Sequence, residues 1–168
     1  MRLMRRKIDD FLKEWKENED RLPLIVKGAR QIGKTPSIMQ FANDNYRNVV
    51  AINFVLQQKF KSIFDDGYDV DSVVRNITLI NPNIELEPGN TIFFFDEMQD
   101  CPVCATSLKA FKIDGRYDVV CSGSLMGINY QEIESNSVGY KEDYTMHSMD
   151  FEEFLYANGM NETAVSFL

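Results

Sequence analysis

Short runs of consecutive apolar residues alternate along this chain with longer segments whose apolar residues recur at helical spacing. The runs LIV, VVAI, IFFF and VVC are typical of strands buried on both faces, and the periodic segments predict amphipathic helices. Polar stretches rich in glycine, proline and asparagine, such as NPNIELEPGN, predict loops between them. We expect strands at 21–28, 48–54, 91–97 and 117–123, helices at 4–18, 34–46, 57–65, 69–79, 106–113 and 150–159, and a loop at 81–90.

This alternation of strands and helices predicts an α/β fold, a three-layer sandwich with a mostly parallel central sheet. The 168 residues suffice for one domain with a sizeable core, so we assign 1–168 to a single domain with a helix within 1–20. No apolar run approaches the ~20 residues that span a bilayer, and the basic N-terminus lacks an apolar signal core. The prediction is a cytoplasmic protein without a membrane partner.

The net charge of −8 is unevenly distributed. Residues 131–168 contain eight acidic side chains and one lysine, so the rest of the chain is almost neutral. Without an excess of lysine and arginine, nucleic-acid binding has no support in the sequence. The chain closes on NETAVSFL, an apolar helix start without a continuation, so we expect these residues to belong to a longer protein.

Residues 28–35, GARQIGKT, match the phosphate-binding pattern G-x-x-x-x-G-K-[ST]. A predicted strand leads into Gly28 and a predicted helix follows Lys34, which is the context that the pattern requires. In such a P-loop, backbone N–H groups surround phosphate oxygens, Lys34 reaches the β- and γ-phosphates, and the Thr35 hydroxyl ligates Mg²⁺. Lys34 is therefore expected to be catalytic, and the expected nucleotide-binding residues are Gly28, Ala29, Arg30, Gln31, Ile32, Gly33, Lys34, Thr35 and Pro36.

Pro36 is unusual at its place in this pattern. Proline is tolerated in the first turn of a helix, where N–H groups have no intrahelical partner. Those N–H groups are nevertheless what a P-loop offers to phosphate, and the residue after Thr35 would usually donate to the α-phosphate. Losing one hydrogen bond to a charged group costs about 1.5–3 kcal/mol, so we expect weak nucleotide binding. Pro36 should also bias Thr35 away from helical geometry.

The apolar run IFFF places Asp96 and Glu97 at the carboxyl end of a buried strand. In parallel α/β sheets ligands bind at that edge, where the P-loop also lies. Asp96 is therefore expected to hold Mg²⁺ through its water shell, and Glu97 to act as the general base that polarises the attacking water. Because acidic residues often end strands, the assignment depends on their pairing with the P-loop.

The next strand ends in the polar stretch SGS. Ser122 or Ser124 is expected beside the γ-phosphate, with Ser122 favoured by its position, and a simple Ser-Gly turn is the alternative. Arg30, Gln31 and Gln99 flank the same edge, where they either brace the loop or contact the substrate.

Three cysteines do not form a disulfide framework, but Cys101 and Cys104 belong to a CPVC motif. A C-x-x-C pair between a strand and a helix is typical of thioredoxin-like redox centres. A zinc site would need two more ligands, for which the sequence offers Cys121 and its single histidine, His147. We favour loop cysteines with neither function.

Together these motifs resemble those of AAA-type ATP-binding proteins of bacteria and archaea that carry an uncharacterised C-terminal domain. The resemblance covers most of the chain and is carried by RRKIDDFLKEWK, PLIVKGARQIGKT, VVAINF, IFFFDEMQDCP, TSLKAFKIDGRYDVVCSGSLMGI and VGYKEDYTMHSMDFEEFL. It implies an additional-strand core, in which one inserted strand separates the acidic strand from the P-loop strand. It also implies ATP and Mg²⁺ as cofactors, Asp96 and Glu97 in the roles given above, and a further domain after these residues.

The resemblance implies an ATPase that couples nucleotide state to the position of that domain, through which a second copy of the chain or another protein would bind. Arg116 and Arg75 are candidates for a catalytic arginine, although both are better explained as structural surface residues. An ATP-binding switch or scaffold with negligible turnover is the alternative. A small-molecule kinase would need an acceptor pocket and an arginine-bearing lid, which the sequence does not show. Adenine is favoured because no Asn/Thr-Lys-x-Asp guanine motif is present.

Overall fold

A five-stranded sheet forms the centre of the computed structural model, which describes residues 5–124, 130–149 and 151–159. The strands lie in the order β2-β3-β4-β1-β5, and every neighbouring pair is parallel. β4 therefore separates the acidic strand β3 from the P-loop strand β1, which is the additional-strand order. The strands are β1 Leu24–Lys27, β2 Asn48–Asn53, β3 Thr91–Asp96, β4 Asp118–Gly123 and β5 Glu142–Thr145.

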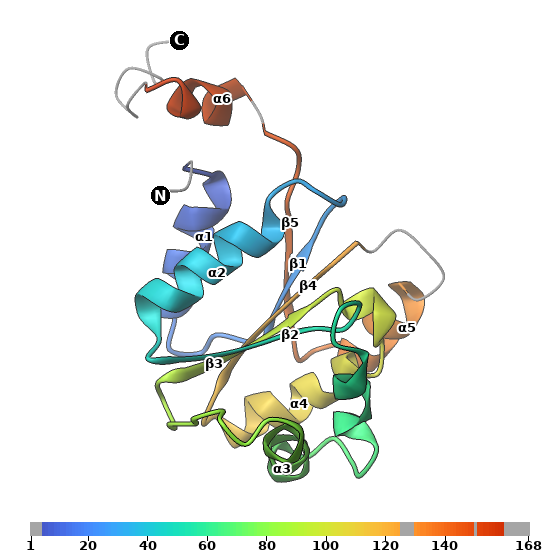
Figure 1. Cartoon of the computed structure of the whole chain (residues 1–168). Coiled ribbons are helices and arrows are strands. Elements are labelled where there is room, and N and C mark those ends of the chain that lie inside the picture. Colours follow the sequence, from blue (N-terminus) through green and yellow to red (C-terminus); the bar gives the residue numbers. More distant parts are fainter. Residues whose placement is uncertain (1–4, 125–129, 150, 160–168) are drawn as a thin grey trace.

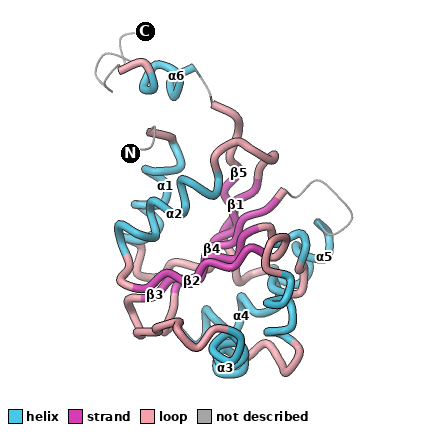
Figure 2. Tube along the Cα trace, in the orientation of Figure 1, coloured by secondary structure: helices cyan, strands magenta, loops and turns pink. Residues whose placement is uncertain are grey.

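Helices cover both faces of this sheet (Figure 1). Figure 2 shows α1 and α2 on one side of the strands, and α3, α4 and α5 on the other. The helices pack on alternate residues of each strand: Ile92 and Phe94 of β3 contact the first pair, whereas Phe93 and Phe95 contact the second group. The expected three-layer α/β sandwich is thus confirmed.

The α-helices are short, and two 3₁₀ helices (η) accompany them. No helix within the three described ranges has the length and apolar character of a membrane span. The helices are α1 Lys7–Glu17, α2 Lys34–Asn45, η1 Gln58–Phe64, α3 Val70–Ile80, η2 Met98–Asp100, α4 Cys104–Asp114, α5 Tyr130–Ser137 and α6 Phe151–Ala157.

Three elements, η2, α5 and β5, are absent from the sequence predictions. β5 consists of Glu-Asp-Tyr-Thr at the edge of the sheet and alternates half-buried with exposed residues, so it lacks the apolar run of an inner strand. The helix predicted at 57–65 is the 3₁₀ helix η1, Gln58–Phe64, and α4 begins at Cys104 rather than at residue 106. Met4, and residues 161–168 on which the expectation of a longer protein rests, lie outside the described residues.

Ion pairs fasten β5 to the edge of the sheet. Lys27, the last residue of β1, lies 2.8 Å from Glu134 of α5 and 3.2 Å from Asp143 of β5. Lys141 contacts the same two carboxylates. Burial raises the pKa of Glu134, but hydrogen bonds from the two lysines outweigh burial and hold that pKa below its ordinary value. Four charges of alternating sign thus stabilise a strand that has few apolar contacts.

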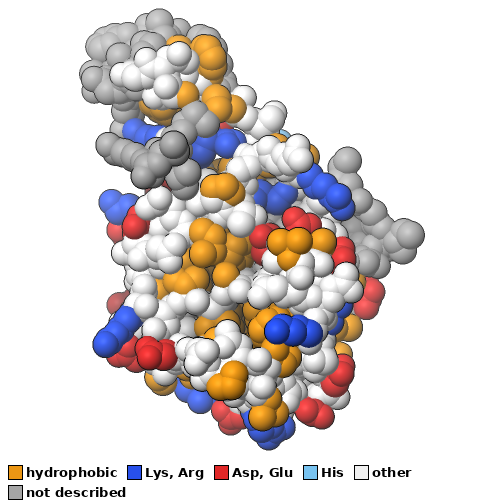
Figure 3. All heavy atoms as spheres, viewed as in Figure 1, with side chains coloured by type: hydrophobic (Ala, Val, Ile, Leu, Met, Phe, Trp, Pro, Cys, Tyr) orange, Lys and Arg blue, Asp and Glu red, His pale blue; other side chains and the backbone are white. Residues whose placement is uncertain are grey.

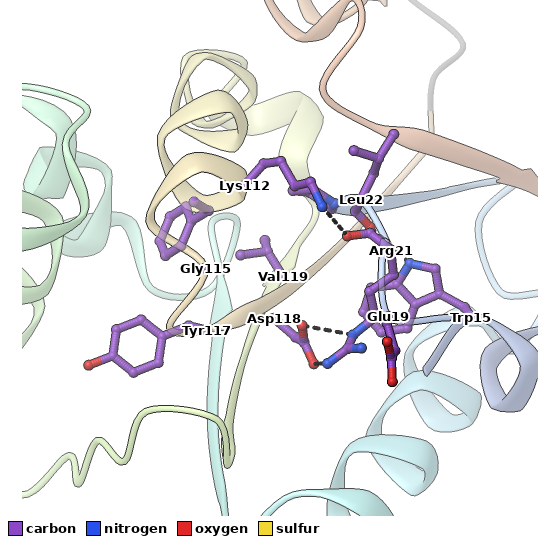
Figure 4. A pocket seen from close by; sticks show the side chains of 11 residues that line it. Trp15, Glu19, Arg21, Leu22, Lys112, Gly115, Tyr117, Asp118 and Val119 are labelled. Atoms are coloured by element: carbon purple, nitrogen blue, oxygen red, sulfur yellow. Dashed lines mark hydrogen bonds and ion pairs between the residues drawn. The ribbon is translucent and has the colours of Figure 1, made fainter. Parts of the chain in front are cut away.

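A second charged contact lies at the opposite, amino end of the strands (Figure 4). Arg21 donates two hydrogen bonds of 2.9 Å to Asp118 at the start of β4, and the Tyr46 hydroxyl donates a third to the same carboxylate. Beside them, Trp15 and Lys112 line a cavity of about 120 Å³. These contacts tie the N-terminal segment and the end of α2 to β4, away from the edge where the P-loop lies.

Candidate functional site

The loop between β1 and α2 has the backbone shape that its glycines predict. Gln31 and Gly33 adopt left-handed conformations with φ of 62° and 93°, and α2 begins directly after Gly33. A Cβ at Gly28 would lie 2.5 Å from the Met146 carbonyl oxygen and 2.6 Å from the Ile32 side chain, so only glycine fits. Successive N–H groups in a turn that mixes left- and right-handed residues form a concave anion site. The loop therefore has the form of a phosphate-binding loop.

The Lys34 side chain folds back across this loop. Its ammonium group donates to the carbonyl oxygens of Gly28 (2.7 Å) and Ala29 (2.5 Å). Burial lowers the pKa of Lys34, while the carboxylates of Glu97 and Asp96 act in the opposite direction. The ammonium group is thus hydrogen-bonded to the loop carbonyls, and the charges of the two acidic residues favour its protonated form.

Asp96 joins three elements of the site through its carboxylate. Oδ2 accepts a hydrogen bond of 2.9 Å from the Thr35 hydroxyl of α2, and Oδ1 accepts one of 2.6 Å from the Ser122 hydroxyl of β4. Oδ1 also accepts a bond of 2.9 Å from the backbone N–H of Glu97. Asp96 is 5% exposed and Ser122 is fully buried. The structure thus brings Thr35, Asp96 and Ser122 together at the carboxyl edge of the sheet.

These oxygens suit a hard divalent cation. Hydroxyl and carboxylate oxygens, completed by phosphate and water, are the ligands that Mg²⁺ takes in nucleotide sites. The Thr35 hydroxyl and one Asp96 oxygen already lie 2.9 Å apart. Across the part of the chain that the structure describes, no group of three or more His, Cys, Asp or Glu side chains forms a metal cage. A cation at this place would take its remaining ligands from phosphate and water.

Glu97 lies just beyond β3 in a left-handed conformation, with φ of 56° and ψ of 47°. This conformation is uncommon for a residue with a side chain, and such residues cluster at functional sites. One carboxylate oxygen of Glu97 accepts a hydrogen bond from the Gln99 amide. Gln99 in turn packs on the end of β4, where a Cβ at Gly123 would lie 2.7 Å from its amide oxygen. Gln99 therefore contacts the candidate base.

The model of a protein family described as "AAA domain" matches residues 20–155. The chain belongs to this AAA-domain family. No curated protein matches the sequence at a significant level. The family and the fold together support nucleotide binding of the ATPase type.

Two solved structures resemble this AAA domain at low sequence identity. The structure of C. elegans PCH-2 aligns with 94% of this chain and 49% of its own chain, at 12% identity and a TM-score of 0.50. The structure of Drosophila ORC bound to GC-rich DNA and Cdc6 aligns with 83% of this chain and 55% of its own, at 12% identity and a TM-score of 0.49. This chain thus spans about half the length of either, and the likeness to PCH-2 supports the fold alone.

Pro36 leaves the start of α2 intact in this AAA domain. Thr35 lies within the helix, so the expectation that Pro36 displaces it from helical geometry is wrong. The first intrahelical bond runs from the Ser37 N–H to the Gly33 carbonyl oxygen (3.2 Å) and needs no donor from Pro36. Pro36 therefore affects this helix start through its missing N–H, which cannot donate to phosphate.

The other flanking residues lie around the rim of the loop. Arg30 and Gln31 are exposed, and the charge of Arg30 contributes to the lowered pKa of Lys34. Ser124 follows β4 and is half-buried, whereas Ser122 binds Asp96 directly. The contact with Asp96 places Ser122 at the site, and the expected position of a serine beside the γ-phosphate stays a prediction.

The structure does not bring the two candidate arginines to this site. Arg116 lies just before Tyr117 and the start of β4, at the amino edge of the sheet, and binds Asp114 at 2.8 Å and Asp71 at 2.6 Å. Arg75 is exposed on α3. Both arginines therefore agree with their description in the sequence analysis as structural surface residues.

The CPVC motif lies in the core. Cys101, Cys104 and Cys121 are all buried free thiols, and Cys104 is the first residue of α4, so the description as loop cysteines holds for Cys101 alone. Burial raises the pKa of Cys101 to about 12, and contact with Cys121 together with burial raises that of Cys104 well above its ordinary value. A reactive cysteine needs a thiolate, so this geometry disfavours redox chemistry. His147 is exposed.

The surface gives no sign of a phosphate-tracking stripe on the face drawn in Figure 3. Lysine and arginine side chains are interspersed there with acidic and neutral ones. This distribution agrees with the nearly neutral charge of the chain before residue 131.

The sequence predictions do not include one residue that lies at the site. Arg6, among the basic residues that precede α1, is buried against the P-loop and donates a hydrogen bond of 2.8 Å to the Ile32 carbonyl oxygen. Basic residues before an amphipathic helix usually lie in solvent, so no local signal distinguishes Arg6 from Arg5.

Proposed function

We propose that this AAA domain binds ATP with Mg²⁺ and hydrolyses it by in-line attack of water on the γ-phosphate. The observation that carries the proposal is the hydrogen-bond network of Asp96, whose carboxylate accepts from hydroxyls of both α2 and β4 beside the P-loop. The AAA-domain family and the fold support the nucleotide-binding part of this proposal.

In this mechanism the P-loop N–H groups and Lys34 bind the phosphates. Thr35 and Asp96 would hold Mg²⁺, which neutralises charge on the phosphate oxygens. Glu97 accepts a proton from the attacking water as the new bond from oxygen to phosphorus forms and the bond to the ADP oxygen breaks. Ser122 fixes the Asp96 carboxylate in place through its hydroxyl.

The second candidate function is an ATP-binding switch or scaffold with negligible turnover. One oxygen of the Glu97 carboxylate is engaged by Gln99, and neither Arg116 nor Arg75 lies at the site. A bound γ-phosphate would then hold a conformation without being cleaved. Both candidate functions use the same ATP-binding site. They differ in whether Glu97 acts as a general base.

A titration of the protein with ATP, with and without Mg²⁺, tests the shared site. We expect saturable binding that tightens with Mg²⁺, and absence of binding in both conditions would overturn both candidates. Turnover of the wild type and of Glu97→Gln then separates them. General-base catalysis contributes about 10²- to 10⁴-fold, so the ATPase proposal expects a loss of that size with ATP affinity retained.

Asp100→Asn is the matched control for this experiment. Asp100 ends the same turn as Glu97 and is exposed, with one long contact of 3.9 Å to Lys61. Turnover should be unchanged in this variant. A wild type that binds ATP without measurable turnover would favour the switch instead.

The resemblance to proteins with a C-terminal domain extends the proposal. We propose that nucleotide state is transmitted to such a domain, which would contact a second copy of the chain or another protein. A cytoplasmic location stays a prediction.

A further inference from the structure

The Arg6 guanidinium joins three distant segments behind the P-loop. Nη1 donates to the carbonyl oxygen of Ile32 (2.8 Å), Nη2 to that of His147 (3.1 Å), and Nε to a carboxylate oxygen of Glu153 on α6 (2.7 Å). The Arg6 and Glu153 side chains are only 8% and 7% exposed. A buried ion pair in which each guanidinium nitrogen donates a hydrogen bond is a specific arrangement, since buried charges are costly unless paired and hydrogen-bonded.

The contact with Ile32 fixes the orientation of one P-loop peptide. The peptide between Ile32 and Gly33 is trans, so its C=O and N–H groups point in opposite directions. Because Arg6 holds the carbonyl oxygen, the Gly33 N–H is directed away from Arg6. The N–H groups of a P-loop must face the phosphates, and a carbonyl in that place would repel them.

Gly33 and Arg6 are also matched sterically. Gly33 has φ of 93°, and a Cβ there would lie 3.0 Å from Nη1 of Arg6. The glycine therefore permits both the left-handed turn and the close approach of the guanidinium. Lys34, the next residue, donates to the carbonyl oxygens of Gly28 and Ala29 at the start of the same loop.

Further hydrogen bonds hold the Arg6 backbone and its partner Glu153 in place. Its backbone N–H donates to Asp9 (2.8 Å), and the Lys7 N–H donates to the same Glu153 oxygen that Arg6 binds (2.9 Å). The planar guanidinium can donate in three fixed directions at once, which a lysine ammonium on a flexible stem does not reproduce.

We propose that Arg6 is a positioning residue for phosphate binding, which holds the Ile32–Gly33 peptide with its N–H available to the nucleotide. The inference rests on the proposed function of the P-loop as an ATP site. A purely structural role, in which Arg6 only docks α6 on α1, would affect stability without a separate effect on ATP affinity.

Two variants of the full chain test the proposal, with the ATP dissociation constant and the melting temperature measured for each. Arg6→Lys keeps the charge opposite Glu153 but loses the fork, and the pair Arg6→Met with Glu153→Met removes both charges and leaves neither buried alone. Losing a bond that orients a phosphate donor should raise the Kd for ATP about tenfold or more in both variants, measured well below their melting temperatures.

Two further variants separate positioning from docking. Glu153→Gln keeps Arg6 and an oxygen acceptor for its Nε, so its ATP affinity should stay near that of the wild type. Arg21→Met with Asp118→Asn removes an ion pair at the opposite edge of the sheet, so it should lower the melting temperature with an unchanged ATP affinity.

The outcomes distinguish this inference from the proposed function. If the wild type binds ATP and the two Arg6 variants bind it equally well, the positioning role is overturned and the ATP site stands. A Glu153→Gln variant that loses as much affinity as Arg6→Lys would also overturn it, because docking of α6 would then set the affinity. A wild type that binds no ATP would overturn the proposed function and this inference with it.

Discussion

A backbone donor restored at position 36 should tighten ATP binding. Pro36 is the third residue of α2 and is exposed. Thr35 and Ser37 on either side are already helical, so Pro36→Ser keeps the backbone and adds one N–H in the first turn. The first intrahelical bond comes from Ser37, and the new donor would therefore stay available for a phosphate oxygen.

The expected size of the effect follows from the charge of that acceptor. A hydrogen bond to a charged group contributes about 1.5–3 kcal/mol, which corresponds to a Kd lower by about 10- to 150-fold. Proline also restricts the unfolded chain, so Pro36→Ser should lower the free energy of unfolding without ligand by about 0.4–1 kcal/mol. The variant should thus be slightly less stable alone and bind ATP more tightly.

Calorimetric titration with ATP and ADP in excess Mg²⁺ measures this effect. Because the restored donor is expected to face the α-phosphate, which ATP and ADP share, both nucleotides should gain equally. Pro36→Ala supplies the same N–H without a hydroxyl and should match the serine variant. Unchanged or weaker ATP affinity in both variants would refute the reasoning, and a gain confined to serine would assign the effect to its hydroxyl.

Three further changes test other parts of the structure. Gly28→Ala should lower the free energy of unfolding by about 1–3 kcal/mol and weaken ATP binding, because its Cβ meets the Met146 carbonyl; an unchanged melting temperature and Kd would contradict this. Cys101→Ser should leave the ATP Kd unchanged, and the native thiol, with its pKa raised to about 12, should react slowly with a thiol reagent; fast labelling would argue for redox chemistry. The pKa of Glu134 is lowered in the folded state, so its ion pairs stabilise the fold above the ordinary value of 4.5. The melting-temperature advantage of the wild type over Glu134→Gln should therefore shrink as the pH falls below that value, and a constant difference would count against these ion pairs.

The inner strands and the core of the site follow from local patterns. IFFF is apolar on both faces because helices cover both, and Ile92 and Phe94 alternate with Phe93 and Phe95 between the two layers. The P-loop pattern and the acidic strand end place Thr35 and Asp96 at the same edge of the sheet, where the structure joins them by a hydrogen bond.

The remaining features depend on contacts between distant residues. Apolar patterns do not predict β5, because this strand lies at the edge of the sheet and its Asp143 forms ion pairs with lysines in place of apolar burial. Arg6 is not predicted because its partners Ile32 and Glu153 lie far along the chain. The left-handed conformation of Glu97 could not be predicted, because such conformations are usually signalled by a glycine.

The order of the strands also decides when the ATP site comes into being during synthesis. β1 is made early, yet both of its neighbours in the sheet, β4 and β5, come from the later part of the chain. The Met146 N–H closes this arrangement with a bond of 2.7 Å to the Lys27 carbonyl oxygen at the base of the P-loop. Pairings so distant in sequence form slowly, because much chain must be ordered first. A nascent chain that lacks these residues therefore has the P-loop sequence without the site, and ATP can stabilise only the finished domain.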